Sequence, residues 1–287
     1  QTGIPPCGPG APCTIGGVDP GTYYLAFPDN WDGKTPLKPF VFFHGHSGSG
    51  SGEIKNNGLV KPLTKQGYVF VAPDGAMIAF RNRNVRSWAA YPENGQPRSG
   101  RNDITFVEKV LEDVARRVPL VPGSTLVSGF SSGGSMAWFF SCYSKITLAG
   151  VIPIAGGLRR PLPPGGKKQA DGSIATTCPG GPRKLIHVHG FIDRQVPLEG
   201  RRIRNWHQGD VFEGLAIQRN TNLCESRPDS AEAKGPVWCR TWSSCKTAIP
   251  MRFCLHAGGH WVPKGWPAQA LDWINAPGAG PALLGGR

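Results

Sequence analysis

Several features are missing from this sequence, and most of these absences exclude a class of protein. No apolar stretch approaches the roughly 20 residues that a membrane-spanning helix needs, so we expect no membrane span. No two cysteines have the C-x-x-C spacing of a zinc ribbon, and there is no internal repeat. Acidic residues are few, 19 against 32 basic ones, but the basic residues form only short clusters. Because no aromatic-basic module accompanies them, we expect no nucleic-acid partner.

What is present indicates a globular protein made for an oxidising compartment. The chain has 287 residues, enough to bury one large core, and 39% of them are hydrophobic. No basic and apolar leader follows Gln1, so we expect any signal peptide to have been removed. The 8 cysteines indicate up to four disulfides, and therefore a secreted protein, extracellular or periplasmic. Among the many possible pairings we expect Cys7–Cys13, Cys142–Cys178, Cys224–Cys245 and Cys239–Cys254.

The net charge of +13 has two interpretations. The basic residues gather at 81–86, at 159–160 and at 201–204. In the first interpretation the chain is a secreted protein of high isoelectric point, and these clusters have no particular partner. In the second they adsorb the protein to an anionic polymer or a cell wall, because a field of one sign raises the local concentration of the opposite charge.

The most informative motif is Gly129-Phe130-Ser131-Ser132-Gly133-Gly134, a G-x-S-x-G pattern that occurs once. A β-branched run at 124–128 precedes it and predicts a buried strand, and the periodicity of 135–143 predicts a helix. This strand–turn–helix context is that of a nucleophile elbow, in which a serine at a sharp corner needs glycine neighbours. A chance glycine-serine turn is the alternative in a chain with 40 glycines.

Two further residues complete the pattern of a serine hydrolase. Asp193 is the first acid after the apolar segment 184–190, which predicts a strand. His260 lies on the glycine-rich loop after a second predicted strand, 251–256. The order serine, acid, histidine, each at the carboxyl end of a strand, is that of an α/β-hydrolase. We therefore expect this fold, with a mostly parallel central sheet and helices on both faces.

The expected roles follow from the chemistry of each side chain. The hydroxyl of Ser131 is a poor nucleophile, so His260 must accept its proton during attack, and Asp193 must orient and stabilise the imidazole. An oxyanion hole needs two N–H donors. We expect the backbone N–H of Ser132 to be one of them. We expect the N–H of His46 to be the other, because His46 lies in a loop directly after the predicted strand 39–43.

Paired histidines leave a metal site as an alternative, although we expect neither a metal nor another cofactor. His44 and His46, and also His187 and His189, have the His-x-His spacing of zinc ligands. No Asp-His pair follows His46, and the acid nearest His189 is already assigned to the triad. We expect instead that His187 or His189 packs in the core or forms a hydrogen bond with the loop that carries Asp193, called the acid loop below.

The chain divides into one domain with two appendages. We expect a Pro/Gly-rich arm at 1–20, a catalytic domain at 21–275 and a flexible tail at 276–287. Further strands are expected at 22–27, 68–73 and 150–156, and a surface loop at 158–183. Trp88 and Trp261 are candidates for the walls of a substrate cleft, with core packing as the alternative for Trp88. The sequence does not indicate an oligomeric state.

Four segments resemble the polyhydroxybutyrate depolymerase and feruloyl or acetyl-xylan esterase group. They are His44-Gly45-His46, the elbow through Met136, His189-Gly190-x-x-Asp193 with Val196-Pro197, and Gly258-Gly259-His260 with Pro263. The resemblance covers about residues 20–275 and extends to Arg86-Ser87-Trp88. It implies a secreted carboxylic-ester hydrolase that acts on polymeric or plant-wall esters.

We therefore expect a serine esterase that forms an acyl-enzyme, with an aliphatic polyester such as polyhydroxybutyrate as the first substrate hypothesis. The alternatives within enzymes are a feruloyl or acetyl-xylan esterase and a hydrolase of β-diketones in oxidised polyvinyl alcohol. A catalytically silent polymer-binding module is the alternative outside enzymes. The sequence leaves the ester and the exo or endo mode open.

Overall fold

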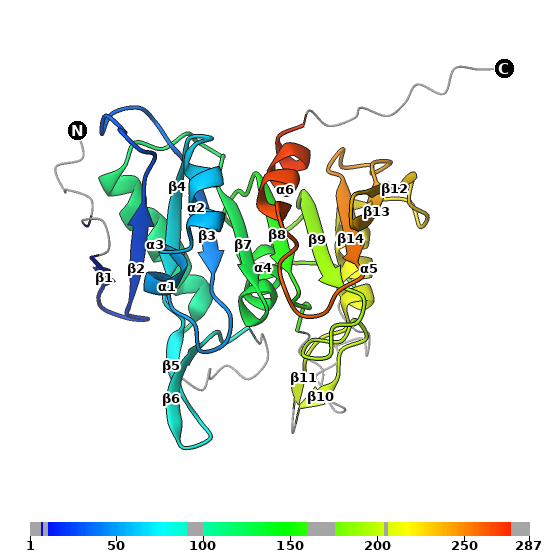
Figure 1. Cartoon of the computed structure of the whole chain (residues 1–287), viewed down its shortest axis with the longest axis horizontal. Coiled ribbons are helices and arrows are strands. Elements are labelled where there is room, and N and C mark those ends of the chain that lie inside the picture. The colour runs from blue at the N-terminus through cyan, green and yellow to red at the C-terminus, as the bar shows by residue number, and fades with distance from the viewer. Residues whose placement is uncertain (1–6, 8–10, 91–99, 160–175, 204–205, 277–287) are drawn as a thin grey trace.

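A ten-stranded sheet runs through the molecule and separates two layers of helices (Figure 1). The computed structural model describes residue 7 and residues 11–90, 100–159, 176–203 and 206–276. Across the sheet, the order of the strands is β1 (Cys13–Ile15), β2 (Gly21–Ala26), β4 (Tyr68–Pro73), β3 (Lys38–Phe43), β7 (Leu126–Phe130), β8 (Gly150–Ile154), β9 (Leu185–Gly190), β14 (Met251–His256), β13 (Val237–Trp242) and β12 (Ser230–Lys234).

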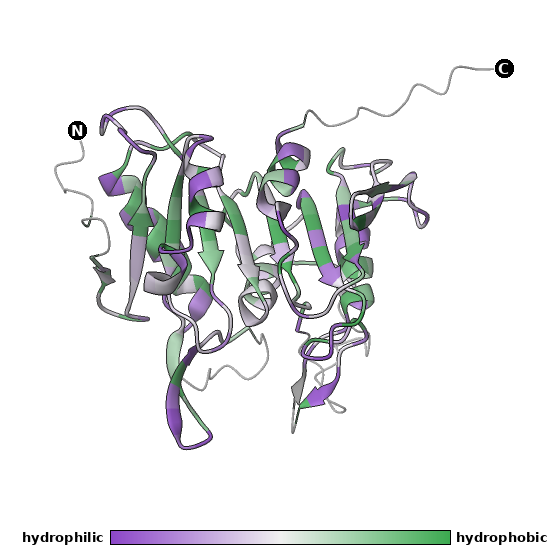
Figure 2. Ribbon diagram, in the orientation of Figure 1, coloured by the Kyte–Doolittle hydropathy of each residue, from purple (hydrophilic) through white to green (hydrophobic). Residues whose placement is uncertain are grey.

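The six central strands, from β4 to β14, are parallel to their neighbours, and the strands outside them pair antiparallel. Strands β4, β8 and β9 are buried along their whole length, as expected for parallel strands covered on both faces. Figure 2 shows these central strands largely in the green of hydrophobic residues. Because they are parallel, their carboxyl ends lie at one edge of the sheet, where loops can bring side chains together.

Helices cover both faces of the sheet, as predicted. One apolar cluster contains residues of α3 (Asp103–Arg117), α4 (Ser132–Tyr143) and α5 (Val211–Asn222). A second cluster, on the other face, contains residues of α2 (Asn57–Thr64) and α6 (Trp266–Asn275). The short α1 (Gly50–Glu53) follows the loop after β3. In α3 the buried residues Phe106, Val107, Val110 and Val114 form the stripe that turns an amphipathic helix toward a core.

Two small hairpins leave the carboxyl edge of the sheet, at the bottom of Figure 1. The first consists of β5 (Ala76–Phe80) and β6 (Arg83–Ser87), directly after β4. The second consists of β10 (Arg202–Ile203) and β11 (Trp206–His207), after β9. Because β4 and β9 lie on opposite sides of β7 in the sheet, the hairpins flank the end of β7. Neither hairpin was predicted, since their strands are short and lack a clear alternation of apolar and polar residues.

Four disulfides are present, and they are the predicted pairs: Cys7–Cys13, Cys142–Cys178, Cys224–Cys245 and Cys239–Cys254. Cys239 and Cys254 are direct partners in the β13–β14 register, which is the expected hairpin arrangement. Cys142 ties α4 to the segment that leads into β9. One disulfide therefore connects the helix after the elbow to the segment that enters the strand before the acid, and another has one cysteine in the strand before the histidine.

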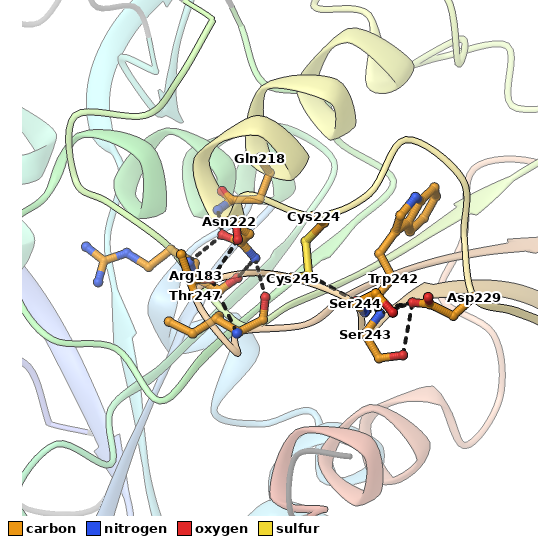
Figure 3. Close-up of a disulfide and its surroundings, with 11 residues drawn as sticks. Arg183, Gln218, Asn222, Cys224, Asp229, Trp242, Ser243, Ser244, Cys245 and Thr247 are labelled. Carbon is orange, nitrogen blue, oxygen red and sulfur yellow. Dashed lines mark hydrogen bonds between the residues drawn. A yellow bond between two sulfur atoms is a disulfide. The ribbon is translucent and has the colours of Figure 1, made fainter. Parts of the chain in front are cut away.

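A buried amide network lies beside the Cys224–Cys245 disulfide (Figure 3). The side chain of Asn222 accepts from the N–H of Arg183 at 3.0 Å and donates to the carbonyl oxygens of Arg183 at 2.8 Å and Ile249 at 2.9 Å. Gln218 donates to the same Asn222 side chain at 2.7 Å. These bonds fix the end of α5 to the segments that enter β9 and β14, the two strands before the acid and the histidine.

Most predicted elements differ from the observed ones only at their ends. Helix α4 begins at Ser132, three residues earlier than predicted, because the elbow turns directly into it. Cys13–Ile15, inside the expected arm, forms the edge strand β1. Residues 1–6, 8–10 and 277–287, and 160–175 of the expected surface loop, lie outside the described residues. Within the part of the chain that is described, no helix has the length and apolar character needed to span a bilayer.

Candidate active site

Ser131 occupies the sharp corner between β7 and α4. Its backbone has φ 58° and ψ −119°, a left-handed conformation that costs free energy and persists only when the surroundings enforce it. Its N–H donates to the carbonyl oxygen of Ile154 at 3.0 Å, which anchors the corner on β8. A side chain at Gly133 would overlap the backbone of Phe43, so only glycine allows α4 to approach β3 this closely. The predicted strand–turn–helix context of the motif is confirmed.

The three predicted triad residues meet at this corner. Nε2 of His260 lies 2.8 Å from Oγ of Ser131, and Nδ1 of His260 lies 2.6 Å from Oδ2 of Asp193. Since the carboxylate accepts the Nδ1 proton, Nε2 is the atom that accepts from the serine hydroxyl. The ring of Phe130 packs on His260 with 4.8 Å between ring centroids. The arrangement can accept a proton from Ser131 as the hydroxyl attacks.

Hydrogen bonds hold Asp193 in its ionised form. Burial by itself raises the pKa of Asp193, but the hydrogen bonds from His189 and His260 and from the N–H of Val196 bring it well below its ordinary value. Its Oδ1 accepts from the N–H groups of Gln195 at 2.8 Å and Val196 at 2.9 Å. The carboxyl group is thus charged and fixed in orientation at neutral pH.

The second histidine pair forms a buried chain behind the acid. Nε1 of Trp138 donates to Nδ1 of His187 at 3.1 Å, and Nε2 of His187 lies 3.0 Å from Nδ1 of His189. Nε2 of His189 in turn lies 2.7 Å from the carbonyl oxygen of Val196 and 3.4 Å from Oδ2 of Asp193. Burial, and then the neighbouring His189, lower the pKa of His187 far below its ordinary value. This pair serves the acid loop, the non-metal role considered from the sequence.

The loop after β3 passes next to the elbow, because a Cβ at Gly45 would lie 3.7 Å from Cβ of Ser131. His44 is fully buried, its Nδ1 donates to the carbonyl oxygen of Gly45 at 2.7 Å, and its Nε2 accepts from the N–H of Gly75 at 2.8 Å. Burial lowers the pKa of His44 to about 4, so the ring is neutral and holds the loop in shape. His46 itself is exposed, and Ser132 is the first residue of α4. An N–H in the first turn of a helix has no partner within that helix and is available to an anion.

The two tryptophan candidates have different positions. Trp88 is 2% exposed, its ring packs on Phe43, and its Nε1 donates to the carbonyl oxygen of His44 at 2.9 Å. It is therefore a core residue beneath the His44 loop and not a cleft wall, which corrects that candidate role. Trp261, the residue after His260, is 52% exposed and contacts His256. Its role as a wall of a substrate cleft stays a prediction.

Sequence reasoning missed two apolar residues at the site. Phe191 and Ile192, directly before Asp193, are 66% and 59% exposed. Their N–H groups donate to the carbonyl oxygens of His256 and Gly258, so the acid loop and the histidine loop form one unit. Phe191, Ile192 and Trp261 are named the apolar platform, because each is exposed and lies within two positions of Asp193 or His260. The signal in the sequence that could have identified them is that two large apolar residues directly precede the predicted catalytic acid.

Among the residues that the structure describes, no three His, Cys, Asp or Glu side chains come together in a way that could hold a metal ion. Charge near the site comes instead from arginine. Partial loss of solvent around its ring, and then the nearby Arg159, lower the pKa of His46. Arg201, directly before β10, donates to the carbonyl oxygens of Arg194 at 3.1 Å and Gln195 at 2.9 Å. These two bonds tie the loop that carries Asp193 to the second hairpin.

Comparison with known proteins shows distant likenesses, and no family model matches the chain. Feruloyl esterase C of Emericella nidulans is 22% identical over 245 residues, which cover 83% of this chain and 75% of the relative. Probable feruloyl esterase C of Aspergillus niger is 21% identical over 246 residues with the same shares. Among solved structures, an acetyl xylan esterase from Aspergillus awamori superposes with a TM-score of 0.64 at 14% identity, covering 92% of this chain and 98% of that one.

A carboxylesterase of Bacillus cereus superposes more loosely, with a TM-score of 0.50 at 11% identity over 88% of this chain and 92% of that one. These neighbours and the sheet order confirm the predicted α/β-hydrolase fold. The chain is a carboxylic-ester hydrolase. The catalytically silent binding module considered from the sequence is thereby set aside.

Proposed function

We propose that Ser131, His260 and Asp193 are the catalytic triad of a secreted serine esterase that cleaves hydroxycinnamoyl esters of a plant-wall polysaccharide. The observation that carries the catalytic part is the continuous hydrogen-bonded chain from Oγ of Ser131 through His260 to Asp193, at 2.8 and 2.6 Å. The four disulfides support an extracellular location, because such bonds persist in oxidising compartments.

The proposed reaction has two steps. Oγ of Ser131 attacks the ester carbonyl carbon while its proton passes to Nε2 of His260, and the carbonyl oxygen becomes an oxyanion held by the N–H groups of His46 and Ser132. The C–O bond to the alcohol then breaks, and His260 returns the proton to the leaving alcohol. Water next attacks the acyl-enzyme with His260 as base, which releases the carboxylic acid and restores the Ser131 hydroxyl.

The apolar platform supports an aromatic acid over an acetyl group. Phe191, Ile192 and Trp261 are exposed apolar side chains within two positions of Asp193 or His260, and an acetyl group is too small to cover them. A phenylpropenoyl ring can stack on such a surface and gain about 1 kcal/mol beyond simple burial. The distant likeness to feruloyl esterase C supports the same choice.

An aliphatic polyester such as polyhydroxybutyrate, the first hypothesis from the sequence, becomes the second candidate. The exposed side chains of the platform favour it in part, since methyl-bearing chains also adhere to apolar surface. It has less support, because the relatives and neighbours reported above are described as esterases of other kinds. The one-domain organisation, with a catalytic domain at 21–275 and appendages at 1–20 and 276–287, also stays a proposal.

One panel of substrates tests the proposal. Methyl ferulate, acetylated xylan, polyhydroxybutyrate film and a β-diketone are assayed side by side with the wild type and Ser131→Ala. We expect the highest kcat/KM on methyl ferulate, and a loss of at least about a thousandfold in Ser131→Ala. Unchanged turnover in Ser131→Ala would remove the triad assignment. Cleavage of polyester film in preference to methyl ferulate would remove the substrate assignment and leave the triad intact.

A further inference from the structure

The β5–β6 hairpin contacts the loop after β3, which carries His46, the predicted oxyanion-hole residue. The ring of Phe80 packs edge-on against His46 with 4.9 Å between ring centroids. Oγ of Ser87 lies 3.3 Å from Nδ1 of His46, and the N–H of Ser47 donates to the carbonyl oxygen of Arg86 at 2.9 Å. The hairpin is therefore fixed to the loop that carries His46, although it projects beyond the sheet (Figure 1).

Two arginines lie around Phe80 at the far end of this hairpin. Arg83 is the direct partner of Phe80 in the register, and cross-strand partners point to the same face of a ribbon. Arg83 thus shares the face that turns toward His46. The guanidinium of Arg81 lies 5.4 Å from the centre of the Phe80 ring. Figure 2 shows this end of the hairpin in the purple of hydrophilic residues.

No carboxylate of the described residues forms an ion pair with either of these two arginines. Both are exposed. The third arginine of the hairpin, Arg86, is different, because its Nε lies 3.3 Å from Oδ2 of the buried Asp74. The base of the hairpin is thus internally paired, and its far end presents positive charge to the surroundings of the active site.

The turn of the hairpin contains an arginine with a positive φ angle. Arg81 and Asn82 connect β5 to β6 with φ angles of 45° and 60°, the combination that a two-residue hairpin turn of type I′ requires. Asparagine and glycine adopt this conformation readily, whereas a long side chain with a Cβ adopts it at a cost of about 1 kcal/mol. An arginine at the first position is therefore unfavourable for folding, which indicates that its side chain has a use outside the hairpin.

We propose that the β5–β6 hairpin is a carboxylate-binding arm, and that the polymer carrying the scissile ester is a polysaccharide with uronate groups, which Arg81 and Arg83 hold next to the active site. A guanidinium matches a carboxylate with two parallel N–H donors. A uronate unit carries such a carboxylate as part of the sugar itself, without sulfation or phosphorylation. The identification of the polymer rests on the proposed function, while the recognition of carboxylates rests on the hairpin alone.

The test measures binding without turnover. The Ser131→Ala protein is titrated with polygalacturonate and, separately, with the same polymer after reduction of its carboxyl groups to neutral alcohols. We expect binding of the charged polymer to weaken about fivefold in Ser131→Ala with Arg81→Gln and Arg83→Gln. We expect the carboxyl-reduced polymer to bind weakly to both proteins, and the difference between the proteins to disappear at high salt.

A matched control changes the same charge elsewhere. Lys61 and Lys65 are exposed at the end of α2, next to the amino end of β4 and so at the opposite edge of the sheet. We expect Lys61→Gln with Lys65→Gln to leave the affinity for polygalacturonate unchanged. Equal weakening in this control would overturn the hairpin assignment and indicate that net charge alone acts.

Two other outcomes would also overturn the proposal. Equal affinity for the carboxyl-reduced polymer would exclude recognition of carboxylates. Tighter hairpin-dependent binding of dextran sulfate at equal charge density would indicate a surface for any polyanion. A failure of the proposed function is distinguishable from these results, because loss of ferulate turnover in the panel leaves the binding titration unaffected.

Discussion

The imidazole rings of His187 and His189 are hydrogen-bonded to each other inside the sheet, with 3.0 Å between Nε2 of His187 and Nδ1 of His189. These two rings belong to a series of hydrogen bonds that runs from Trp138 to Val196. Its donor-to-acceptor direction is fixed at both ends, because the indole N–H of Trp138 can only donate and the carbonyl oxygen of Val196 can only accept. Each imidazole is therefore neutral and carries its proton on Nε2. The series links α4, which begins at the elbow, to the loop that carries Asp193.

The hydrogen bonds of His189 predict the effect of His189→Ala. The change leaves Nε2 of His187 and the carbonyl oxygen of Val196 without their partners in a fully buried region, so we expect the free energy of unfolding to fall by about 3 kcal/mol. The acid loop also loses a fixed contact, so we expect kcat to fall about tenfold while KM changes little. Urea unfolding and steady-state kinetics on a p-nitrophenyl ester measure the two effects.

His189→Gln is the conservative variant for this prediction. The glutamine amide can place an N–H near the position of Nε2, so we expect part of the lost kcat to return. A full loss of kcat in His189→Gln at unchanged stability would contradict a role in positioning Asp193. Normal kcat in His189→Ala would contradict it as well.

The nucleophile elbow and the triad were predictable from the sequence because their signals are local. Gly129 and Gly133 mark a corner that tolerates no side chain, and Asp193 and His260 each follow an apolar strand. The carboxyl ends of parallel strands converge, so the order along the chain was enough to place these groups together.

The β5–β6 hairpin was not predictable in the same way. Its turn is Arg81-Asn82 and not Asn-Gly, the pair typical of a two-residue hairpin turn. Its five-residue strands also show little alternation of apolar and polar residues. The burial of Trp88 was equally hidden. Its partner, the carbonyl oxygen of His44, lies 44 positions earlier in the chain, and only the packing of the loop on Phe43 brings them together.

Trp261 and Trp88 predict opposite phenotypes. Trp261→Ala removes part of an exposed platform, so we expect kcat/KM on methyl ferulate to fall about tenfold, with stability changed by less than about 0.5 kcal/mol. Trp88→Ala removes a buried ring and its hydrogen bond, so we expect a loss of about 4 kcal/mol in stability. Thermal unfolding and kinetics of both variants check this. A destabilised Trp261→Ala protein with normal kinetics would contradict the platform.

His44 predicts a pH dependence of stability. Burial lowers the pKa of this histidine from 6.5 to about 4, so the folded state excludes a proton that the unfolded state binds between these values. Stability from His44 is therefore fully present above pH 6.5 and is lost as the pH falls toward 4. At pH 5 the loss from this residue is about 2 kcal/mol.

His44→Gln isolates this contribution. Glu53 acts in the opposite direction, because burial raises its pKa from 4.5 to about 6, so the wild type alone does not report on His44. We expect the difference in unfolding free energy between wild type and His44→Gln to shrink by about 2 kcal/mol between pH 7.5 and pH 5. Chemical denaturation at both pH values measures it, and a constant difference would show that His44 is not neutral and buried in solution.

Arg81→Asn separates the stability of the hairpin from its proposed use. Asparagine adopts the left-handed conformation of the turn with little strain, so we expect the free energy of unfolding to rise by about 0.5–1 kcal/mol. The same change removes one of the two exposed guanidinium groups, so we expect weaker binding of polygalacturonate, by about twofold. Opposite shifts in the melting temperature and in affinity would be the signature of a residue retained for binding at the expense of folding. A variant that gains stability and keeps its affinity would show that Arg81 does not touch the polymer, and the carboxylate-binding role would then rest on Arg83 alone.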